Sequence, residues 1–156
     1  MHNNPTRKKI RFLLVEDDLD HAAILTRAMK GQPFDCELHH VENGVDALAY
    51  LRHEPPFQAS ADPDVVLLDL KLPKLSGHEV LSEIRKDPEL ADIPVIILST
   101  SNAESDIKNV YQNHANSYLV KPLDFQSFRK MAEDLQEYWG QWNNVPRRST
   151  PRYKGG

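Results

Sequence analysis

Short apolar runs of strand length alternate with amphipathic helical patterns along this chain, and this alternation is the feature that most constrains its fold. The stretches between the runs carry apolar residues at spacings of three and four, which is typical of helices packed on one side. Regular alternation of strands and helices predicts a parallel sheet with helices on both faces and right-handed crossovers. The predicted strands span residues 10–15, 36–41, 65–69, 94–99 and 117–120.

Helices are predicted for the intervening segments, with a Pro-containing loop over 53–64. We therefore expect an α/β fold: a doubly wound five-stranded parallel sheet in the flavodoxin-like order 2-1-3-4-5. In this order, the binding crevice forms between strands one and three, at their carboxyl ends. The predicted helices span residues 21–30, 44–52, 77–86 and about 104–113, and a fifth begins at about 124 and runs to 142.

Polar side chains follow four of the five strands at the point where each strand ends. Asp69 closes the run Val65-Val66-Leu67-Leu68, and the run Glu16-Asp17-Asp18 follows the first strand. Ser99 ends the fourth strand and Lys121 follows the fifth. Since the carboxyl ends of parallel strands meet at one edge of the sheet, these groups should converge. Clustered carboxylates favour a hard divalent cation, and an ammonium and a hydroxyl favour phosphate.

Bulk properties indicate one ordinary globular domain. The chain has 156 residues, 27% of them charged, and its net charge of −4 gives no reason to expect nucleic acid as a partner. No apolar run reaches the roughly 18 residues of a membrane helix, and no signal peptide is recognisable. The single Cys36 cannot form an internal disulfide. We expect a cytoplasmic protein that does not bind membranes.

The motifs at the strand ends, taken together and in this order, resemble the receiver domain of two-component response regulators. Each motif alone is weak, but five in sequence form a specific pattern that covers residues 10 to about 135. The matching segments are Leu14-Val15-Glu16-Asp17, Leu67-Leu68-Asp69, Pro73 with Gly77, Ile97-Leu98-Ser99 and Tyr118-Leu119-Val120-Lys121-Pro122.

The resemblance implies a role for each residue. Asp69 would accept a phosphoryl group from a sensor histidine kinase, and Ser99 and Lys121 would contact the phosphoryl oxygens. Mg²⁺ would be held by Glu16, Asp17, Asp69 and the backbone carbonyl of Lys71, with Glu16 acting through water. The choice of Glu16 and Asp17 over Asp17 and Asp18 as the acidic pair rests on the resemblance. Asp18 is also a candidate cap for the first helix.

The segment after the last strand is predicted to form an interaction surface. We expect a receiver domain over 8–145 and a flexible tail over 146–156, whose basic residues are solvated. A helix over 124–142 would be about 28 Å long and would overhang the sheet, carrying Tyr138, Trp139 and Trp142 beyond the core. Its ending resembles that of single-domain regulators paired with bacterial phytochromes, which implies a bacteriophytochrome kinase and a homodimer through these residues. Alternatively, Trp139 folds back under Pro146 or a loop.

Two other functions compete with a signalling receiver. A phosphatase of the haloacid dehalogenase type also uses Mg²⁺ and a strand-end Asp, but needs a second acid two residues later, where this chain has Lys71. A flavodoxin-type cofactor carrier would need a phosphate-binding first loop. Here that loop is acidic, without Gly, and would repel a phosphate unless a cation intervened.

Overall fold

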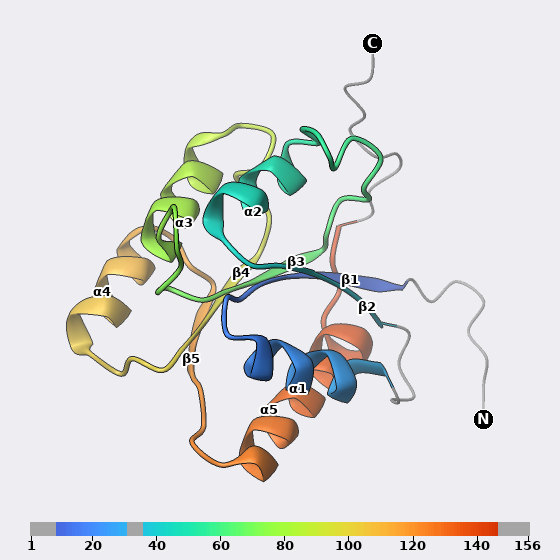
Figure 1. Ribbon diagram of the computed structural model, residues 1–156, viewed down its shortest axis with the longest axis vertical. Coiled ribbons are helices and arrows are strands. Elements are labelled where there is room, and N and C mark those ends of the chain that lie inside the picture. Colours follow the sequence, from blue (N-terminus) through green and yellow to red (C-terminus); the bar gives the residue numbers. More distant parts are fainter. Residues whose placement is uncertain (1–8, 31–35, 147–156) are drawn as a thin grey trace.

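The fold is a five-stranded parallel sheet between two layers of helices, seen in a computed structural model that describes residues 9–30 and 36–146 (Figure 1). The strand order is β2-β1-β3-β4-β5, and every neighbouring pair is parallel. The predicted α/β class and order 2-1-3-4-5 are confirmed. The strands are β1 (Ile10–Val15), β2 (Cys36–Val41), β3 (Val65–Leu68), β4 (Val95–Ser99) and β5 (Ser117–Val120).

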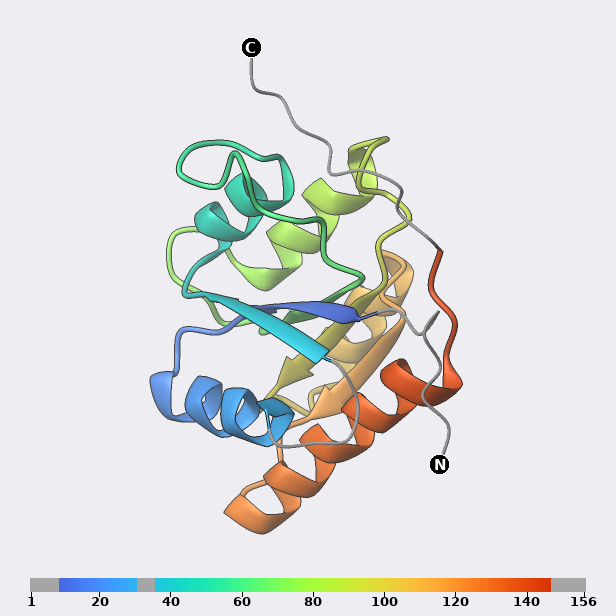
Figure 2. The same ribbon diagram turned by 90° about the vertical axis from the view of Figure 1, so that its right-hand side faces the viewer.

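Helices cover both faces of the sheet (Figures 1 and 2), with α2, α3 and α4 on one side and α1 and α5 on the other. One core cluster joins the sheet to α2, α3 and α4, and the second joins it to α1 and α5. Within residues 9–30 and 36–146, no helix combines the length and apolar character needed to cross a bilayer. The helices are α1 (Leu19–Lys30), α2 (Gly44–Leu51), α3 (Gly77–Lys86), α4 (Glu104–Gln112) and α5 (Phe125–Glu137).

Side-chain caps explain where several helices begin. Asp18 accepts hydrogen bonds from the backbone N–H groups of Asp20 and His21, at 3.0 and 3.2 Å, so α1 begins two residues earlier than predicted. Ser76 and Glu79 form a reciprocal capping box at the start of α3, and Asp124 caps α5. These caps fix the turns that leave the carboxyl edge of the sheet, and Asp18 takes the capping role that the sequence left open.

Strand register brings distant residues to one edge. Val15 pairs with Leu68 and Leu68 with Ile97, so the residues after β1 and β3 lie side by side. Ser99 pairs with Val120, and the Lys121 N–H donates to the Ser99 carbonyl at 2.7 Å. The carboxyl ends of four strands are thereby locked together by backbone hydrogen bonds.

The carboxyl-terminal segment departs from the prediction of one continuous helix. α5 ends at Glu137 and continues as a π-helical turn, η1 (Tyr138–Trp142), in which the Asn143 N–H donates to the Tyr138 carbonyl. This wider turn takes Trp142 off the apolar stripe of α5. Trp139 is only 8% exposed and belongs to the α1–α5 core cluster, against which Val145 packs.

The prediction that Trp139 lies beyond the core is therefore wrong, because the chain after η1 folds back over it. Tyr138 and Trp142 do remain on the surface, with 53% and 66% of their areas exposed. The other end of the predicted stripe, Phe125, is also exposed. The basic tail residues predicted to be solvated, Arg147, Arg148, Arg152 and Lys154, lie outside the described residues.

Candidate functional site

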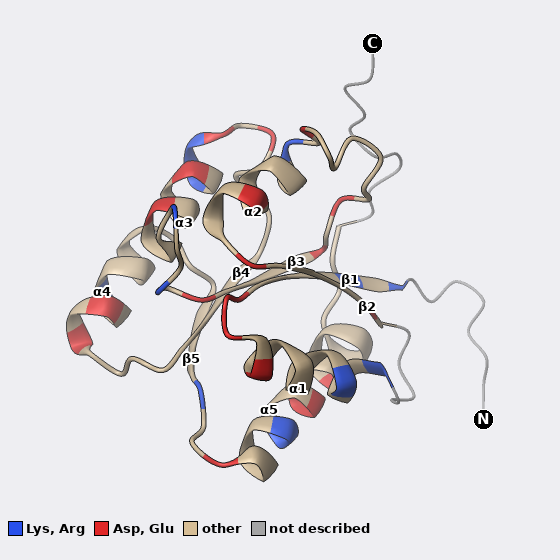
Figure 3. Ribbon diagram, in the orientation of Figure 1, with Lys and Arg blue, Asp and Glu red and all other residues tan. Residues whose placement is uncertain are grey.

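Acidic and basic side chains meet where β1, β3, β4 and β5 end. Figure 3 shows acidic segments leaving the ends of β1 and β3 and a basic segment at the end of β5. Glu16 and Asp17 follow β1, Asp69 follows β3, Ser99 closes β4 and Lys121 follows β5. The five side chains predicted to converge therefore come from one edge of the sheet, at the crevice expected between strands one and three.

Three carboxylates form the centre of this site. One carboxylate oxygen from each of Glu16, Asp17 and Asp69 lies within 4.8 Å of the others. Glu16 is 1% exposed and Asp69 8% exposed, whereas Asp17 faces solvent. Burial raises the pKa of the Glu16 carboxyl to about 7; the Asp69 carboxylate adds to this rise, and Lys121 opposes it. A set of three oxygen donors with one open side fits a hard divalent cation.

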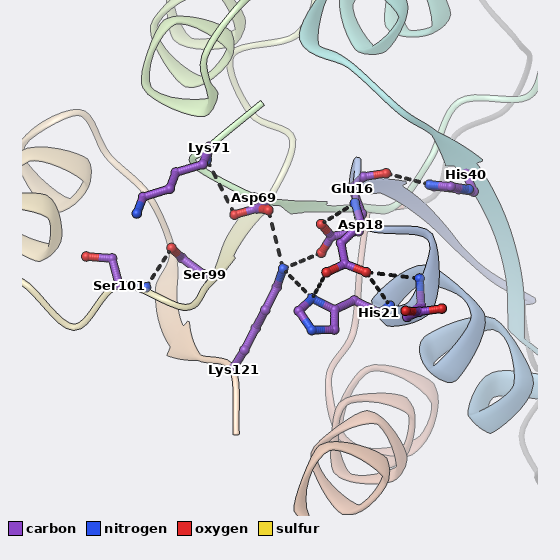
Figure 4. A network of polar contacts seen from close by, with 10 residues as sticks. Glu16, Asp18, His21, His40, Asp69, Lys71, Ser99, Ser101 and Lys121 are labelled. Carbon is purple, nitrogen blue, oxygen red and sulfur yellow. Dashed lines mark hydrogen bonds and ion pairs between the residues drawn. The ribbon is translucent and has the colours of Figure 1, made fainter. Parts of the chain in front are cut away.

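Lys121 supplies the positive charge that the three acids need (Figure 4). Its buried Nζ lies 2.5 Å from Glu16 Oε1 and 3.3 Å from Asp69 Oδ2. A third contact, at 3.1 Å, goes to His21 Nδ1. The hydrogen bonds of Nζ run to Asp69 and His21, and the contact with Glu16 Oε1 is an ion pair without hydrogen-bond geometry. Lys121 thus holds two of the carboxylates in place while staying next to the oxygens of Asp69.

Backbone groups fix the acidic loop after β1. The Asp18 N–H donates to Glu16 Oε2 at 3.1 Å, and the Glu16 N–H donates to the Val41 carbonyl at 3.0 Å. His40 Nε2 lies 2.7 Å from the Glu16 carbonyl oxygen, so this ring donates to it. His39 points to the opposite face of β2 and packs on Tyr50. The two neighbouring histidines therefore face opposite sides of the sheet.

The structure explains why a glycine, Gly77, follows the predicted phosphoryl acceptor. A Cβ atom at this position would lie 2.1 Å from the Asp69 carbonyl oxygen and 2.6 Å from Leu70 Cα. The Gly77 N–H also donates to the Leu70 carbonyl. Only glycine allows the first turn of α3 to pass this close to the backbone that carries Asp69.

A second polar network surrounds Ser99 on the opposite side of Asp69. The fully buried Ser99 hydroxyl accepts from the Ser101 N–H at 3.1 Å, and the Ser101 hydroxyl donates to Asp106 at 2.7 Å. The Tyr118 hydroxyl donates to the Ser101 carbonyl at 2.8 Å. Asp106 in turn lies 3.2 Å from His78 Nε2, across the α3–α4 contact. Ser99 is therefore connected to the start of α4.

The structure brings Glu16 and Asp69 into direct contact with Lys121, places Asp17 within 4.8 Å of both carboxylates, and places Ser99 on the next strand end. The Lys71 side chain is exposed, and its N–H lies 3.4 Å from Asp69 Oδ1. His21 is a site residue that sequence reasoning missed. Its place three residues after the cap Asp18 was the available signal, since that spacing turns it toward the same edge.

Comparisons with known proteins agree with this geometry. The family model described as the response regulator receiver domain matches residues 12–133. The probable methanogenesis regulatory protein FilR2 of Methanothrix harundinacea is 44% identical over 86% of this chain and 86% of its own length. Response regulator Rcp1 of a Synechocystis species is 36% identical over 86% of this chain and 92% of its own length.

Solved structures show the same fold at high overlap. The phosphorylated cyanobacterial phytochrome response regulator RcpA has a TM-score of 0.86 at 36% identity, covering 90% of this chain and 100% of that one. The Mn²⁺-bound form of Rcp1 has a TM-score of 0.85 at 35% identity, covering 88% of this chain and 99% of that one. By fold, by strand-end residues and by sequence, this chain belongs to the response regulator receiver family and is related to phytochrome response regulators.

Proposed function

We propose that Asp69 accepts a phosphoryl group from a sensor histidine kinase in a Mg²⁺-dependent reaction. The observation that carries this proposal is the convergence of Glu16, Asp17 and Asp69 within 4.8 Å, with the Lys121 ammonium beside Asp69. A phosphorylated relative and a Mn²⁺-bound relative support the same assignment. Glu16, Asp17, Asp69 and the Lys71 carbonyl would hold the ion, which would neutralise charge on the phosphoryl oxygens.

In the proposed reaction, an Asp69 carboxylate oxygen forms a bond to phosphorus as the bond from phosphorus to the kinase imidazole breaks. The electron pair of that bond returns to the imidazole nitrogen, and Asp69 becomes an acyl phosphate. Lys121 moves from the carboxylate oxygens to a phosphoryl oxygen, and Ser99 donates its hydroxyl to another. Hydrolysis of the acyl phosphate, for which the protein needs no partner, returns the resting state.

Intact-mass measurement after incubation with phosphoramidate and Mg²⁺ tests this assignment. The wild type should gain the mass of one phosphoryl group, and Asp69→Asn should gain none. Asp20→Asn is the matched control, because it removes an exposed carboxylate from the neighbouring first turn of α1. Loss of phosphorylation on chelation of Mg²⁺ is expected, and a phosphorylated Asp69→Asn protein would show that the acceptor lies elsewhere.

The donor we propose is a bacteriophytochrome-type kinase. RcpA is a phytochrome response regulator, and a regulator in red-light signalling of R. palustris has a TM-score of 0.79 at 30% identity, covering 89% of this chain and 99% of that one. The higher identity to FilR2 favours a second candidate, a kinase of the kind that serves methanogenesis regulation. Transfer rates from purified kinases of both kinds separate the two, since the cognate kinase should phosphorylate Asp69 fastest.

The output we propose is a change at the protein surface, including a homodimer through Tyr138 and Trp142, in a cytoplasmic location. Both side chains are exposed, and Tyr138 lines a groove of about 670 Å³ between β5, α5 and the segment Asn143–Pro146. Exposed aromatic residues beside an apolar groove favour association.

Sedimentation analysis of the Tyr138→Ala, Trp142→Ala double variant tests the dimer. The variant should be monomeric at concentrations at which the wild type is dimeric. Tyr111→Ala is the control, because it removes an exposed aromatic residue from α4 instead. A wild type that remains monomeric at tens of micromolar, with and without phosphorylation, would contradict the proposal.

A further inference from the structure

We propose that His21 is a positioning residue that holds the Lys121 ammonium at the phosphorylation site. The two side chains meet across α1 and β5, with 3.1 Å between His21 Nδ1 and Lys121 Nζ (Figure 4). This inference rests on the proposed phosphorylation of Asp69. It assigns a role to His21, which is not one of the clustered carboxylates and is neither Ser99 nor Lys121.

His21 is held in place both at its ring and at its backbone. It packs on the Phe128 ring of α5, with 5.2 Å between ring centroids and 31° between ring planes. Phe128 is among the fully buried residues of the α1–α5 core. At the other side, the His21 backbone N–H donates to the cap Asp18. An aromatic contact and a helix cap therefore keep Nδ1 pointed at the end of β5.

The contact also assigns the tautomer of His21. An ammonium can only donate, so a nitrogen bonded to Lys121 must offer its lone pair. Asp18 Oδ2 lies 3.5 Å from the same Nδ1, which is a longer contact than the one to Lys121. The geometry thus favours a neutral imidazole with its proton on Nε2.

The other two partners of Lys121 change during the proposed reaction, and His21 does not. Glu16 and Asp69 hold the ammonium in the structure, but both carboxylates would be shared with the metal and the phosphoryl group. A lysine on a flexible four-carbon stem needs a remaining acceptor to stay aligned. His21 Nδ1 is that acceptor, which leaves the other ammonium donors free for phosphoryl oxygens.

A matched pair of substitutions separates the acceptor from the shape of the side chain. In His21→Asn, the amide Oδ1 occupies nearly the place of Nδ1 and can accept from Lys121. His21→Leu keeps the bulk, and Leu is a good helix former, so it does not weaken α1. We expect His21→Leu to bind beryllium trifluoride, a phosphoryl mimic, about tenfold more weakly than the wild type, and His21→Asn to recover most of that loss.

Two further measurements keep a structural effect apart from a positioning effect. Mg²⁺ affinity should stay close to the wild-type value in both variants, because His21 contacts none of the three clustered carboxylates that would bind the ion. In the metal-free wild type, the ¹⁵N shift of Nδ1 should report an unprotonated, hydrogen-bonded nitrogen, and Lys121→Met should change it.

Equal beryllium trifluoride affinity in the wild type and His21→Leu would overturn the inference, as would an Asn variant no better than Leu. A protonated Nδ1 in the metal-free protein would also overturn it. These results are distinct from failure of the proposed function, which would appear as a wild type that Mg²⁺ and phosphoramidate do not phosphorylate on Asp69.

Discussion

The two sides of Asp69 are built differently. On the α1 side, formed by Glu16, His21 and Lys121, buried charges pair at short distances, and the Lys121 ammonium donates to Asp69 and His21. On the α4 side, formed by Ser99, Ser101, Asp106 and His78, hydroxyl and imidazole groups link the buried Ser99 through half-exposed side chains to α4 and α3. The Asp106 pKa is lowered there by the Ser101 hydroxyl and by His78.

This difference suggests that the two sides have different roles, one in positioning the reacting groups and the other in conformational change. Breaking a buried charge pair leaves an uncompensated charge and is strongly destabilising, whereas a half-exposed hydrogen bond can exchange with water at low cost. The α1 side is therefore suited to keep the reacting groups in place. The α4 side is suited to rearrange when a phosphoryl group draws the Ser99 hydroxyl toward Asp69.

Among the predicted changes, removal of the Lys121 charge from the α1 side should have the largest effect on stability. In the metal-free protein, Lys121→Met should lower the free energy of unfolding by about 3 kcal/mol. This value is at the lower end of the range for removing one partner of a buried ion pair, because Glu16 can take up a proton when the ammonium is absent. Denaturant unfolding in a chelator measures this loss. Mg²⁺ should restore more stability to Lys121→Met than it adds to the wild type, since the ion replaces the missing charge.

Lys71→Met is the control for this substitution. It removes an equally long cationic side chain from the same edge, but one that is exposed, so its effect should stay within about 0.5 kcal/mol. If the two variants lost the same stability, the ammonium of Lys121 would not be the group that holds the α1 side together.

The buried Glu16 carboxyl should give the metal-free protein a stability that falls as pH rises. Its pKa is about 7 in the folded protein, against 4.5 for the ordinary group, so the folded state binds this proton more tightly than the unfolded state. The contribution is fully present below pH 4.5 and is lost as pH rises through 7. It amounts to on the order of 3 kcal/mol at most.

Comparison with Glu16→Gln isolates the contribution of the Glu16 carboxyl to the pH dependence of stability. The free energy of unfolding of the wild type, minus that of Glu16→Gln, should decrease between pH 4.5 and 7 in a chelator. Taking the difference removes the contributions of carboxyls that both proteins share. Among these, Asp18 and Asp106 have lowered pKa values and titrate below this pH range. Parallel pH profiles for the two proteins would show that Glu16 is already ionised at low pH.

Much of the fold and of the α1 side could be predicted because both follow from periodicity. Five apolar runs define five parallel strands, and parallel strands place the residues that follow the first, third and fifth runs, Glu16, Asp69 and Lys121, at one edge, independently of the loop conformations. The close approach of Gly77 to Asp69 could not be read from the chain, although the residue itself was part of the motif.

What could not be predicted depends on contacts between distant elements. An apolar stripe continues to Trp142 in the sequence, but a single π-helical turn rotates Trp142 outward and lets residues near Val145 cover Trp139. His21 reads as an ordinary helix residue until α5 brings Phe128 against its ring and β5 brings Lys121 to its Nδ1. Likewise, the link from Ser99 to His78 needs α3 and α4 to be in contact.

The smallest expected effect lies on the α4 side, and its sign is opposite to that of His21→Leu. His78 contacts two residues of α4, with Nδ1 2.9 Å from Asn109 Oδ1 and Nε2 3.2 Å from Asp106 Oδ1. Since Asp106 accepts from the Ser101 hydroxyl, and Ser101 donates to Ser99, these contacts restrain the hydroxyl that must move. His78→Leu should therefore strengthen binding of beryllium trifluoride, by at most about tenfold, because a half-exposed hydrogen bond contributes about 0.5–1.5 kcal/mol.

Isothermal titration with beryllium trifluoride and Mg²⁺ measures this change, and Gln112→Leu, which replaces an exposed polar residue in the last turn of α4, is the control. Weaker binding by His78→Leu would mean that the α3–α4 contact supports Ser99 in its phosphoryl-bound position rather than restraining it in the resting one. The difference between the two sides of Asp69 would then be one of burial alone. A variant that binds more tightly, beside a His21→Leu variant that binds more weakly, would instead show that one side holds the reacting groups while the other opposes their rearrangement.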